Sequence, residues 1–214
     1  QIVRLDADTQ DIPGFLGRLV SKTGEPVIRR AIVQAIRILG RQFVMGRTIK
    51  EALKRAKSGS NKDYRYSYDM LGEAALTEAD AERYVDAYAA AIVDVGKASG
   101  GKGPYEAPGM SIKLSALPSR YSYAQHDRIL RELVPRLIGL AELARDAGIG
   151  LTVDAEEAER LDLSLDVIEA VLYRMGKKRW DGFGLAVQAY QKRAIDVVDW
   201  VATLAQKSGW RMSV

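Results

Sequence analysis

Three short apolar runs of this chain each carry one polar residue at or near the end of a predicted buried strand. The runs cover residues 110–115, 151–154 and 185–189, and the interrupting residues are Lys113, Asp154 and Gln188. A strand covered on both faces is normally an almost continuous run of Val, Ile and Leu, and a charge buried within it is costly unless it meets a partner or a ligand. Since about one helix separates successive runs, we predict that these polar side chains meet at the mouth of a parallel barrel.

Helix and strand patterns alternate from residue 63 onward. Strands are predicted at residues 64–68, 110–116, 149–154, 183–189 and 210–214, and helices at about 77–98, 124–146, after Ser164 and at about 193–207. This alternation indicates an α/β fold with a parallel sheet. Polar residues repeated at the strand ends favour a (βα)8 TIM-like barrel over a doubly wound sheet. Because such a barrel typically needs about 250 residues, we expect only its first four to five βα units here.

The chain before residue 63 shows only helical patterns. A helix with an apolar stripe begins near Glu25, and Thr48 caps the start of a second, shorter helix. Residues 58–62, Ser-Gly-Ser-Asn-Lys, interrupt the pattern and mark the predicted boundary. We therefore expect a helical arm, suited to dimerisation, over residues 1–62 and the amino-terminal half of a barrel over residues 63–214.

The composition, with 47% hydrophobic and 28% charged residues, is that of an ordinary globular protein. The net charge of +4 comes from interspersed basic and acidic residues, which gives no support for a nucleic-acid surface. The chain has no cysteine, which excludes disulfides and thiolate metal sites and suits a reducing cytoplasm. Its only histidine is His126, which excludes a histidine triad and a multi-histidine metal site, so we expect no metal. The most apolar helical stretch, residues 87–95, is too short to cross a bilayer.

Each of the three strand-end residues has a chemical and a structural explanation. Lys113 is suited to bind an anionic substrate group or a cofactor carbonyl, or to form a Schiff base, but a lysine on an edge strand can also extend into solvent. Asp154 is suited to orient a substrate amine, a hydroxyl group or a metal, and also to cap the following helix. Gln188 carries an amide that both donates and accepts, which suits the edge of a heteroaromatic ring as well as backbone groups at a barrel rim.

Two acidic residues follow the first predicted strand. Asp69 and Glu73 lie four residues apart, so they would share a face if this segment were helical. They fit the acidic start of a helix, where the macrodipole favours negative charge. One of them is alternatively suited to hold an arginine of the site.

Four sequence motifs, in this order, resemble those of the proline dehydrogenase domain in bacterial proline-utilisation flavoenzymes. They are YSYDMLGEAALT at 66–77, SIKLSAL at 111–117, DAEE at 154–157 and QAYQKR at 188–193. The resemblance covers about residues 24–214, and the helical segment that precedes the barrel is similar to the arm of that family.

This resemblance implies a distorted (βα)8 barrel that binds FAD without a Rossmann fold. The implied reaction is oxidation of L-proline to Δ1-pyrroline-5-carboxylate by hydride transfer to the flavin, with a membrane quinone as the electron acceptor. The implied protein is cytoplasmic, can lie peripherally at the inner membrane, and is bifunctional, with an NAD-dependent aldehyde dehydrogenase module outside these residues.

The same resemblance implies roles for individual residues. It assigns Lys113 to the substrate carboxylate and Asp154 to both cofactor and substrate. It assigns Glu73 to an acid that pairs with a substrate-binding arginine. The further cofactor-lining positions are Ala155, Ala186 and Gln188.

The chain also departs from the family pattern. Residues 116–121 read Ala-Leu-Pro-Ser-Arg-Tyr, where His-Pro is expected before Arg-Tyr. The family's complete fifth strand and the paired arginines of its last helix are not within these residues, so we expect an ordered portion of a larger protein that is inactive by itself. Two alternatives stay open: a Schiff-base aldolase that uses Lys113 with Asp154 as proton shuttle, and a non-catalytic fragment whose arm mediates dimerisation.

Overall fold

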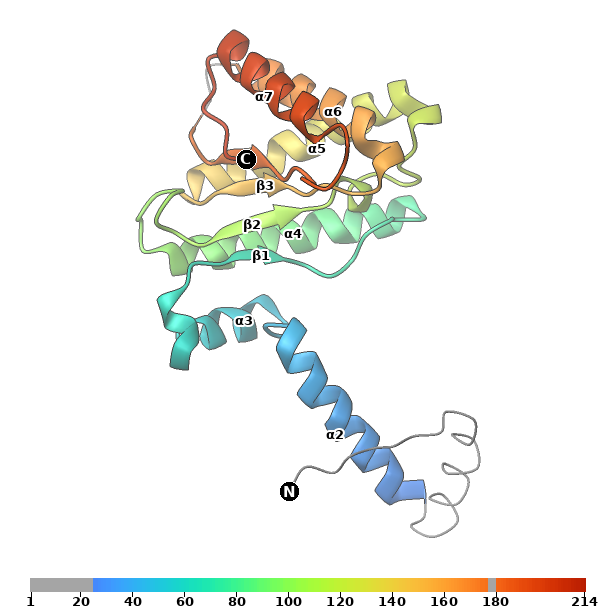
Figure 1. Ribbon diagram of the computed structural model, residues 1–214, viewed down its shortest axis with the longest axis vertical. Helices are drawn as coiled ribbons and strands as arrows, with labels where there is room; N and C mark the ends of the chain where they lie inside the picture. The colour runs from blue at the N-terminus through green and yellow to red at the C-terminus, as the bar shows by residue number, and fades with distance from the viewer. Residues whose placement is uncertain (1–24, 177–179) are drawn as a thin grey trace. The chain divides into compact units, whose positions relative to one another are not determined.

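The computed structural model describes residues 25–176 and 180–214 and divides into two compact units, with the boundary between Arg47 and Thr48 (Figure 1). In the first unit the described structure is helix α2, Glu25–Phe43, which begins where the sequence predicts. Residues 1–24 of the predicted arm lie outside the described residues. The division falls fifteen residues before the predicted arm boundary, and the role of the arm stays a prediction.

The second unit is built around a four-stranded parallel sheet in the order β1-β2-β3-β4. The strands are β1 Ser67–Asp69, β2 Gly109–Ile112, β3 Leu151–Val153 and β4 Phe183–Leu185. Sequential parallel pairing of neighbours is the topology of successive βα units in a barrel, so the predicted fold class is confirmed. Beyond β4 the chain returns to the sheet and forms a parallel bridge between Gly184 and Ser213, where a Cβ atom on Gly184 would collide with the Ser213 backbone.

The helices of this unit precede, connect or follow the strands and pack on their neighbours. They are α3 Ile49–Ala56, α4 Glu78–Ser99, α5 His126–Asp146, α6 Leu161–Met175 and α7 Ala194–Ser208. Helix α4 contacts β2, α5 packs between α4 and α6, and α6 contacts α7 (Figure 1). No helix within residues 25–176 and 180–214 combines the length and the apolar character that crossing a membrane requires.

Two of the predicted helix starts follow directly from local hydrogen bonding. The Thr77 hydroxyl accepts from the Asp80 amide while the Asp80 carboxylate accepts from the Thr77 amide, which is a complete capping box at the start of α4. The Thr48 hydroxyl accepts from the amide of Glu51 at the start of α3. Helix α4 ends at Gly100, whose positive φ of 65° is easy for a residue without a Cβ atom.

The two faces of the sheet differ in chemistry, because side chains alternate along each strand. One face is apolar and buried beneath the helices. It consists of Tyr68, Met110, Ile112, Leu151, Val153, Phe183 and Leu185. The opposite face carries Ser67, Asp69, Ser111 and Thr152, and the hydroxyls of Ser67 and Ser111 lie 3.1 Å apart. This polar face is continuous with the strand ends that hold the candidate site.

Several predicted boundaries are wrong. The second and fourth strands stop at Ile112 and Leu185, because the chain turns into a 3-10 helix at 114–116 after one and leaves the sheet after the other. The first strand is 67–69 instead of 64–68. Helix α6 starts before Ser164, whose hydroxyl donates to a carbonyl of the first helical turn.

Candidate functional site

The carboxyl ends of three adjacent strands bring together one lysine and two aspartates. Asp69 is the last residue of β1, while Lys113 and Asp154 directly follow β2 and β3. The Lys113 ammonium lies 2.7 Å from Asp69 Oδ2 and 3.2 Å from Asp154 Oδ2. The cluster carries one positive and two negative charges, so it can contact both an anionic and a cationic group of a ligand.

The strand register explains why these side chains meet. Asp69 pairs with Ser111 across β1 and β2, and the Asp154 amide donates to the carbonyl of Ile112, which continues the ladder one residue beyond β3. Lys113 therefore lies beside Asp154, two residues beyond Ser111 on the same face of the sheet. All three charged side chains follow the polar face of the sheet to its rim.

The Lys113 side chain is well enclosed, with 17% of its surface exposed, against 21% for Asp154 and 41% for Asp69. Burial lowers the pKa of Lys113, but the hydrogen bonds and charges of Asp69 and Asp154 outweigh it, so the net pKa of Lys113 is raised. Lys113 is consequently held as a cation between the two carboxylates.

A buried tyrosine supports the backbone of Lys113 from the helical side. Tyr88 of α4 is fully buried, and its hydroxyl accepts a 3.3 Å hydrogen bond from the Lys113 amide. Burial raises the pKa of Tyr88 to about 12. The phenol therefore stays neutral and keeps its oxygen directed at the end of β2.

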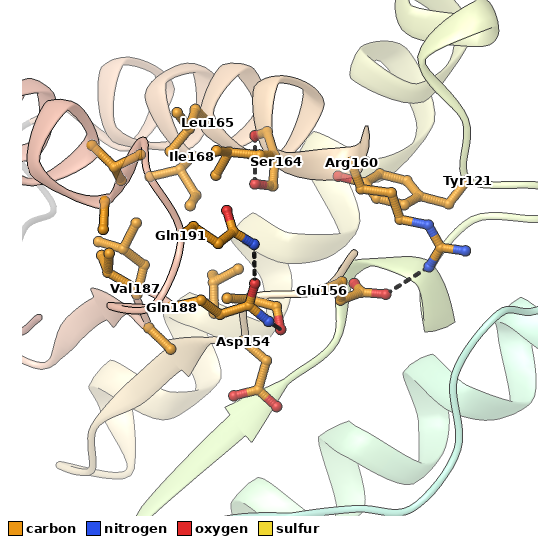
Figure 2. A pocket seen from close by; sticks show the side chains of 17 residues that line it. Tyr121, Asp154, Glu156, Arg160, Ser164, Leu165, Ile168, Val187, Gln188 and Gln191 are labelled. Carbon is orange, nitrogen blue, oxygen red and sulfur yellow. Dashed lines mark hydrogen bonds and ion pairs between the residues drawn. The ribbon is translucent and has the colours of Figure 1, made fainter. Parts of the chain in front are cut away.

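A pocket adjoins this cluster at the ends of β3 and β4 (Figure 2). Its wall includes Asp154, Ala155, Ala186 and Gln188, together with apolar side chains of α6 and α7. The Gln188 Nε2 atom lies 3.5 Å from the Ala155 carbonyl, and Gln191 Nε2 donates to Gln188 Oε1. The wall of the pocket thus contains Asp154 of the charged cluster, the amide of Gln188 and two small side chains.

Glu73 forms no hydrogen bond or ion pair with the cluster. Asp69 and Glu73 do not share a helix, because Asp69 ends β1 and Glu73 lies in the loop before α4. The Glu73 side chain is exposed and makes no hydrogen bond or ion pair to another residue in the described part of the chain. A helical reading of this segment is therefore wrong, while the proposed role of Glu73 stays a prediction.

Two residues that the sequence analysis did not select occupy the site's immediate surroundings. Glu156 is 8% exposed, its Oε1 accepts a 2.9 Å hydrogen bond from the Ser115 amide, and its Oε2 lies 2.9 Å from Arg160 (Figure 2). Ser115 is fully buried and linked by hydrogen bonds to the loop that carries Glu73. Each lies two residues beyond a candidate, Asp154 or Lys113, and that spacing was the available signal.

Comparison with known proteins identifies a family. The family model described as proline dehydrogenase matches residues 52–214. Curated relatives named Bifunctional protein PutA are 52% identical over 93% of this chain in Klebsiella aerogenes and 51% identical over 93% in Escherichia coli (strain K12). The chain spans about 15% of the length of these relatives.

Solved structures give the same result. A mutant of Bradyrhizobium japonicum proline utilization A (PutA) aligns with a TM-score of 0.75 and 52% identity over 92% of this chain and 20% of that one. PutA from Bdellovibrio bacteriovorus, inactivated by N-propargylglycine, aligns with a TM-score of 0.77 at 24% identity, over 87% of this chain and 21% of that one. The second similarity supports the fold alone.

Proposed function

The chain belongs to the proline dehydrogenase family, and from that premise we propose that it forms part of an enzyme that oxidises L-proline to Δ1-pyrroline-5-carboxylate with FAD. One observation carries the proposal beyond the family. Lys113 is held as a cation between two strand-end carboxylates, next to a pocket with an amide and small side chains on its wall. This arrangement offers opposite charges to the two charged groups of an amino acid.

Free L-proline carries a carboxylate and a secondary ammonium group on neighbouring atoms. Lys113 supplies positive charge for the carboxylate, and its raised pKa keeps that charge at neutral pH. Asp154 binds Lys113 through Oδ2, and its other oxygen makes no hydrogen bond within the described residues, so it can orient a second polar group. The proposed task of these residues is to hold the substrate in one orientation, which is a large part of what a site contributes to a two-substrate reaction.

The residues around the pocket fit a flat heteroaromatic cofactor. Ala155 and Ala186 have one-carbon side chains at the ends of β3 and β4, which leaves room for a ring to approach the strand ends. Gln188 is held by hydrogen bonds from Tyr190 and Gln191, so its amide is oriented in advance. When bound, FAD would supply a two-electron acceptor for the hydride from the proline carbon next to the nitrogen.

The remaining features of the proposal come from the family resemblance of the sequence motifs. Because the relatives are bifunctional proteins, we propose that an NAD-dependent aldehyde dehydrogenase module and the second half of the barrel accompany these residues. A membrane quinone is the proposed electron acceptor, and the protein is proposed to be cytoplasmic with peripheral membrane contact. Glu73 is proposed to pair with a substrate-binding arginine outside the described residues.

The Schiff-base alternative is disfavoured by the same geometry. An aldolase lysine must lose its proton to attack a carbonyl, which requires a lowered pKa. Asp69 and Asp154 stabilise the protonated form of Lys113 and keep its pKa raised. Borohydride trapping of a carbonyl substrate on Lys113 in a colourless protein would reverse this choice.

The proposal is tested with the full-length protein by its flavin absorbance and by proline-dependent reduction of a quinone analogue. Lys113→Met and Asp154→Asn are each expected to lower kcat/KM for proline by at least about a hundredfold, because each removes a charge that the substrate or cofactor contacts. Lys97→Met is the matched control, since Lys97 is 74% exposed at the far end of α4 and pairs only loosely, at 3.9 Å, with Asp94. Normal flavin content and turnover in both site variants would defeat the proposal.

A further inference from the structure

A second layer of hydrogen bonds lies directly beyond the charged cluster, at the same strand ends. Ser115 follows Lys113 by two residues and is fully buried. Its amide donates to Glu156 Oε1 at 2.9 Å, and Glu156 follows Asp154 by two residues. The pair of Lys113 and Asp154 is therefore accompanied by a second pair, in which a backbone amide takes the place of the ammonium group as donor to a carboxylate.

Ser115 also holds the loop between β1 and α4. Its hydroxyl accepts a 3.1 Å hydrogen bond from the Ala74 amide, and its carbonyl accepts a 3.0 Å hydrogen bond from the Ala75 amide. Two successive backbone amides of the loop thus donate hydrogen bonds to one buried residue, Ser115. The loop segment directly after Glu73 is fixed by a residue that belongs to a different strand end.

The backbone of Ala74 needs this support. Its φ of 54° is in the left-handed region, which costs an L-residue with a Cβ atom about 1–2 kcal/mol. Such a conformation persists when surrounding contacts over-determine it, and it is found preferentially at functional sites. Since Ala74 follows Glu73 directly, the conformation of Ala74 constrains the path of the backbone that carries Glu73.

Glu156 in turn fixes Ser115. Its buried carboxylate is held between the Ser115 amide and Arg160, and the Arg160 guanidinium lies 5.9 Å from the centre of the Tyr121 ring (Figure 2). A carboxylate that bridges a backbone amide and an arginine has little freedom to move. The layer therefore connects the end of β3 to the loop after β1 through Ser115.

We infer that Ser115, held in place by Glu156, is a positioning residue for Glu73 in the proline site. The inference rests on the proposed function, because it needs Glu73 to contribute to binding of the substrate carboxylate. Ser115 has no contact with substrate in this role. It acts through the Ala74 conformation and so through the direction of the Glu73 side chain.

A double-mutant cycle between Ser115→Ala and Glu73→Gln tests the inference in the full-length protein. Ser115→Ala alone is expected to raise the KM for proline about tenfold, because the Ala74 amide loses its acceptor, while kcat and flavin content change less than about threefold. In the Glu73→Gln background the same substitution should change KM by less than about twofold, since the group that it positions is already altered.

The matched control is Ser99→Ala. Ser99 is also a buried serine whose hydroxyl accepts from a backbone amide, that of Gly101, but it lies at the opposite end of α4 from Glu73. This variant should leave the KM for proline unchanged. An equal rise in KM from Ser115→Ala with and without Glu73→Gln would overturn the inference, and so would an unchanged KM in Ser115→Ala or in Glu73→Gln alone.

A second variant covers the case in which Ser115→Ala does not fold. Glycine adopts a positive φ without the Cβ penalty, so Ala74→Gly combined with Ser115→Ala should fold and bring KM to within about threefold of the unaltered protein. A folded double variant whose KM stays tenfold raised would show that Ser115 does not act through Ala74. Failure of the proposed function is read separately, as absence of flavin and of proline oxidation in the unaltered protein.

Discussion

Replacing Lys113 with methionine removes the cation that holds Asp69 and Asp154 together. Methionine keeps much of the length and the apolar part of the lysine side chain, so the change isolates the ammonium group. The negative charges of Asp69 and Asp154 then repel each other at the rim of the sheet, because no cation lies between them. We therefore expect the ends of β1, β2 and β3 to separate more easily in Lys113→Met.

The size of the effect follows from the two contact distances. At 2.7 and 3.2 Å, two ion pairs in water-like dielectric are together worth about 3 kcal/mol, and a lower dielectric would raise that figure. Desolvation of the ammonium group opposes the gain, and Asp69 is 41% exposed, so solvent weakens its share. We expect a net loss of about 2–3 kcal/mol in the local free energy of opening.

Hydrogen exchange of the full-length protein, followed by mass spectrometry, measures this locally. Peptides that cover β1, β2 and β3 should lose protection by about thirtyfold to 150-fold in Lys113→Met, whereas Lys97→Met should leave them unchanged. Combining Lys113→Met with Asp69→Asn removes one of the two opposed carboxylates and should restore about tenfold of the protection. If the single variant exchanges like the unaltered protein, or if Asp69→Asn makes the loss worse, the electrostatic reasoning is wrong.

Two further predictions concern Tyr88 on α4 and His126 at the start of α5. Tyr88→Phe removes the acceptor of the Lys113 amide and should cost about 1–3 kcal/mol of local stability, seen as faster exchange of β2, whereas retained protection would exclude a role for that hydrogen bond. The hydrogen bond to Asp127, followed by hydrogen bonding and charge from Asp166, raises the pKa of His126 despite some desolvation. Protonated His126 therefore stabilises the fold fully below about pH 6.5, and this contribution is lost as pH rises through the higher folded pKa. Melting temperature measured against pH should lose this component in His126→Gln, and an unchanged profile would contradict it.

The gathering of polar side chains at the strand ends could be predicted from sequence because it depends on two regular patterns. Side chains alternate along a strand, and parallel strands of successive βα units end on the same side of the sheet. A polar residue placed directly after an apolar run must therefore reach the common rim. Lys113 and Asp154 meet this condition, and they lie 3.2 Å apart.

The strand lengths could not be predicted in the same way. Apolar residues after Ile112 and Leu185 look like strand in the sequence, but they continue as a buried 3-10 helix in the first case and, in the second, as a loop whose side chains are exposed or half-buried. A short apolar run does not distinguish these backbones. The pairing of Lys113 with Asp69 is similarly a tertiary event, set by the register of β1 against β2.

The sequence indicates Ser115 and Glu156 less clearly than it indicates the charged residues of the site. A serine in an apolar run and a glutamate in an acidic run have no unusual local pattern, and each accepts from a backbone amide of a different segment, Ser115 from Ala74 and Glu156 from Ser115. Glu156 also pairs with Arg160, four residues further along the chain. A backbone partner has no residue type that the sequence could reveal, so the two-residue spacing from Lys113 and Asp154 was the only signal for this pair. The charged cluster of the site could therefore be predicted from the sequence, whereas the hydrogen bonds of Ser115 and Glu156 were found from the coordinates. Ser115 and Glu156 lie within the motifs at 111–117 and 154–157, so a variant that kept only the charged residues Lys113 and Asp154 would lose the hydrogen bonds to the loop that follows Glu73.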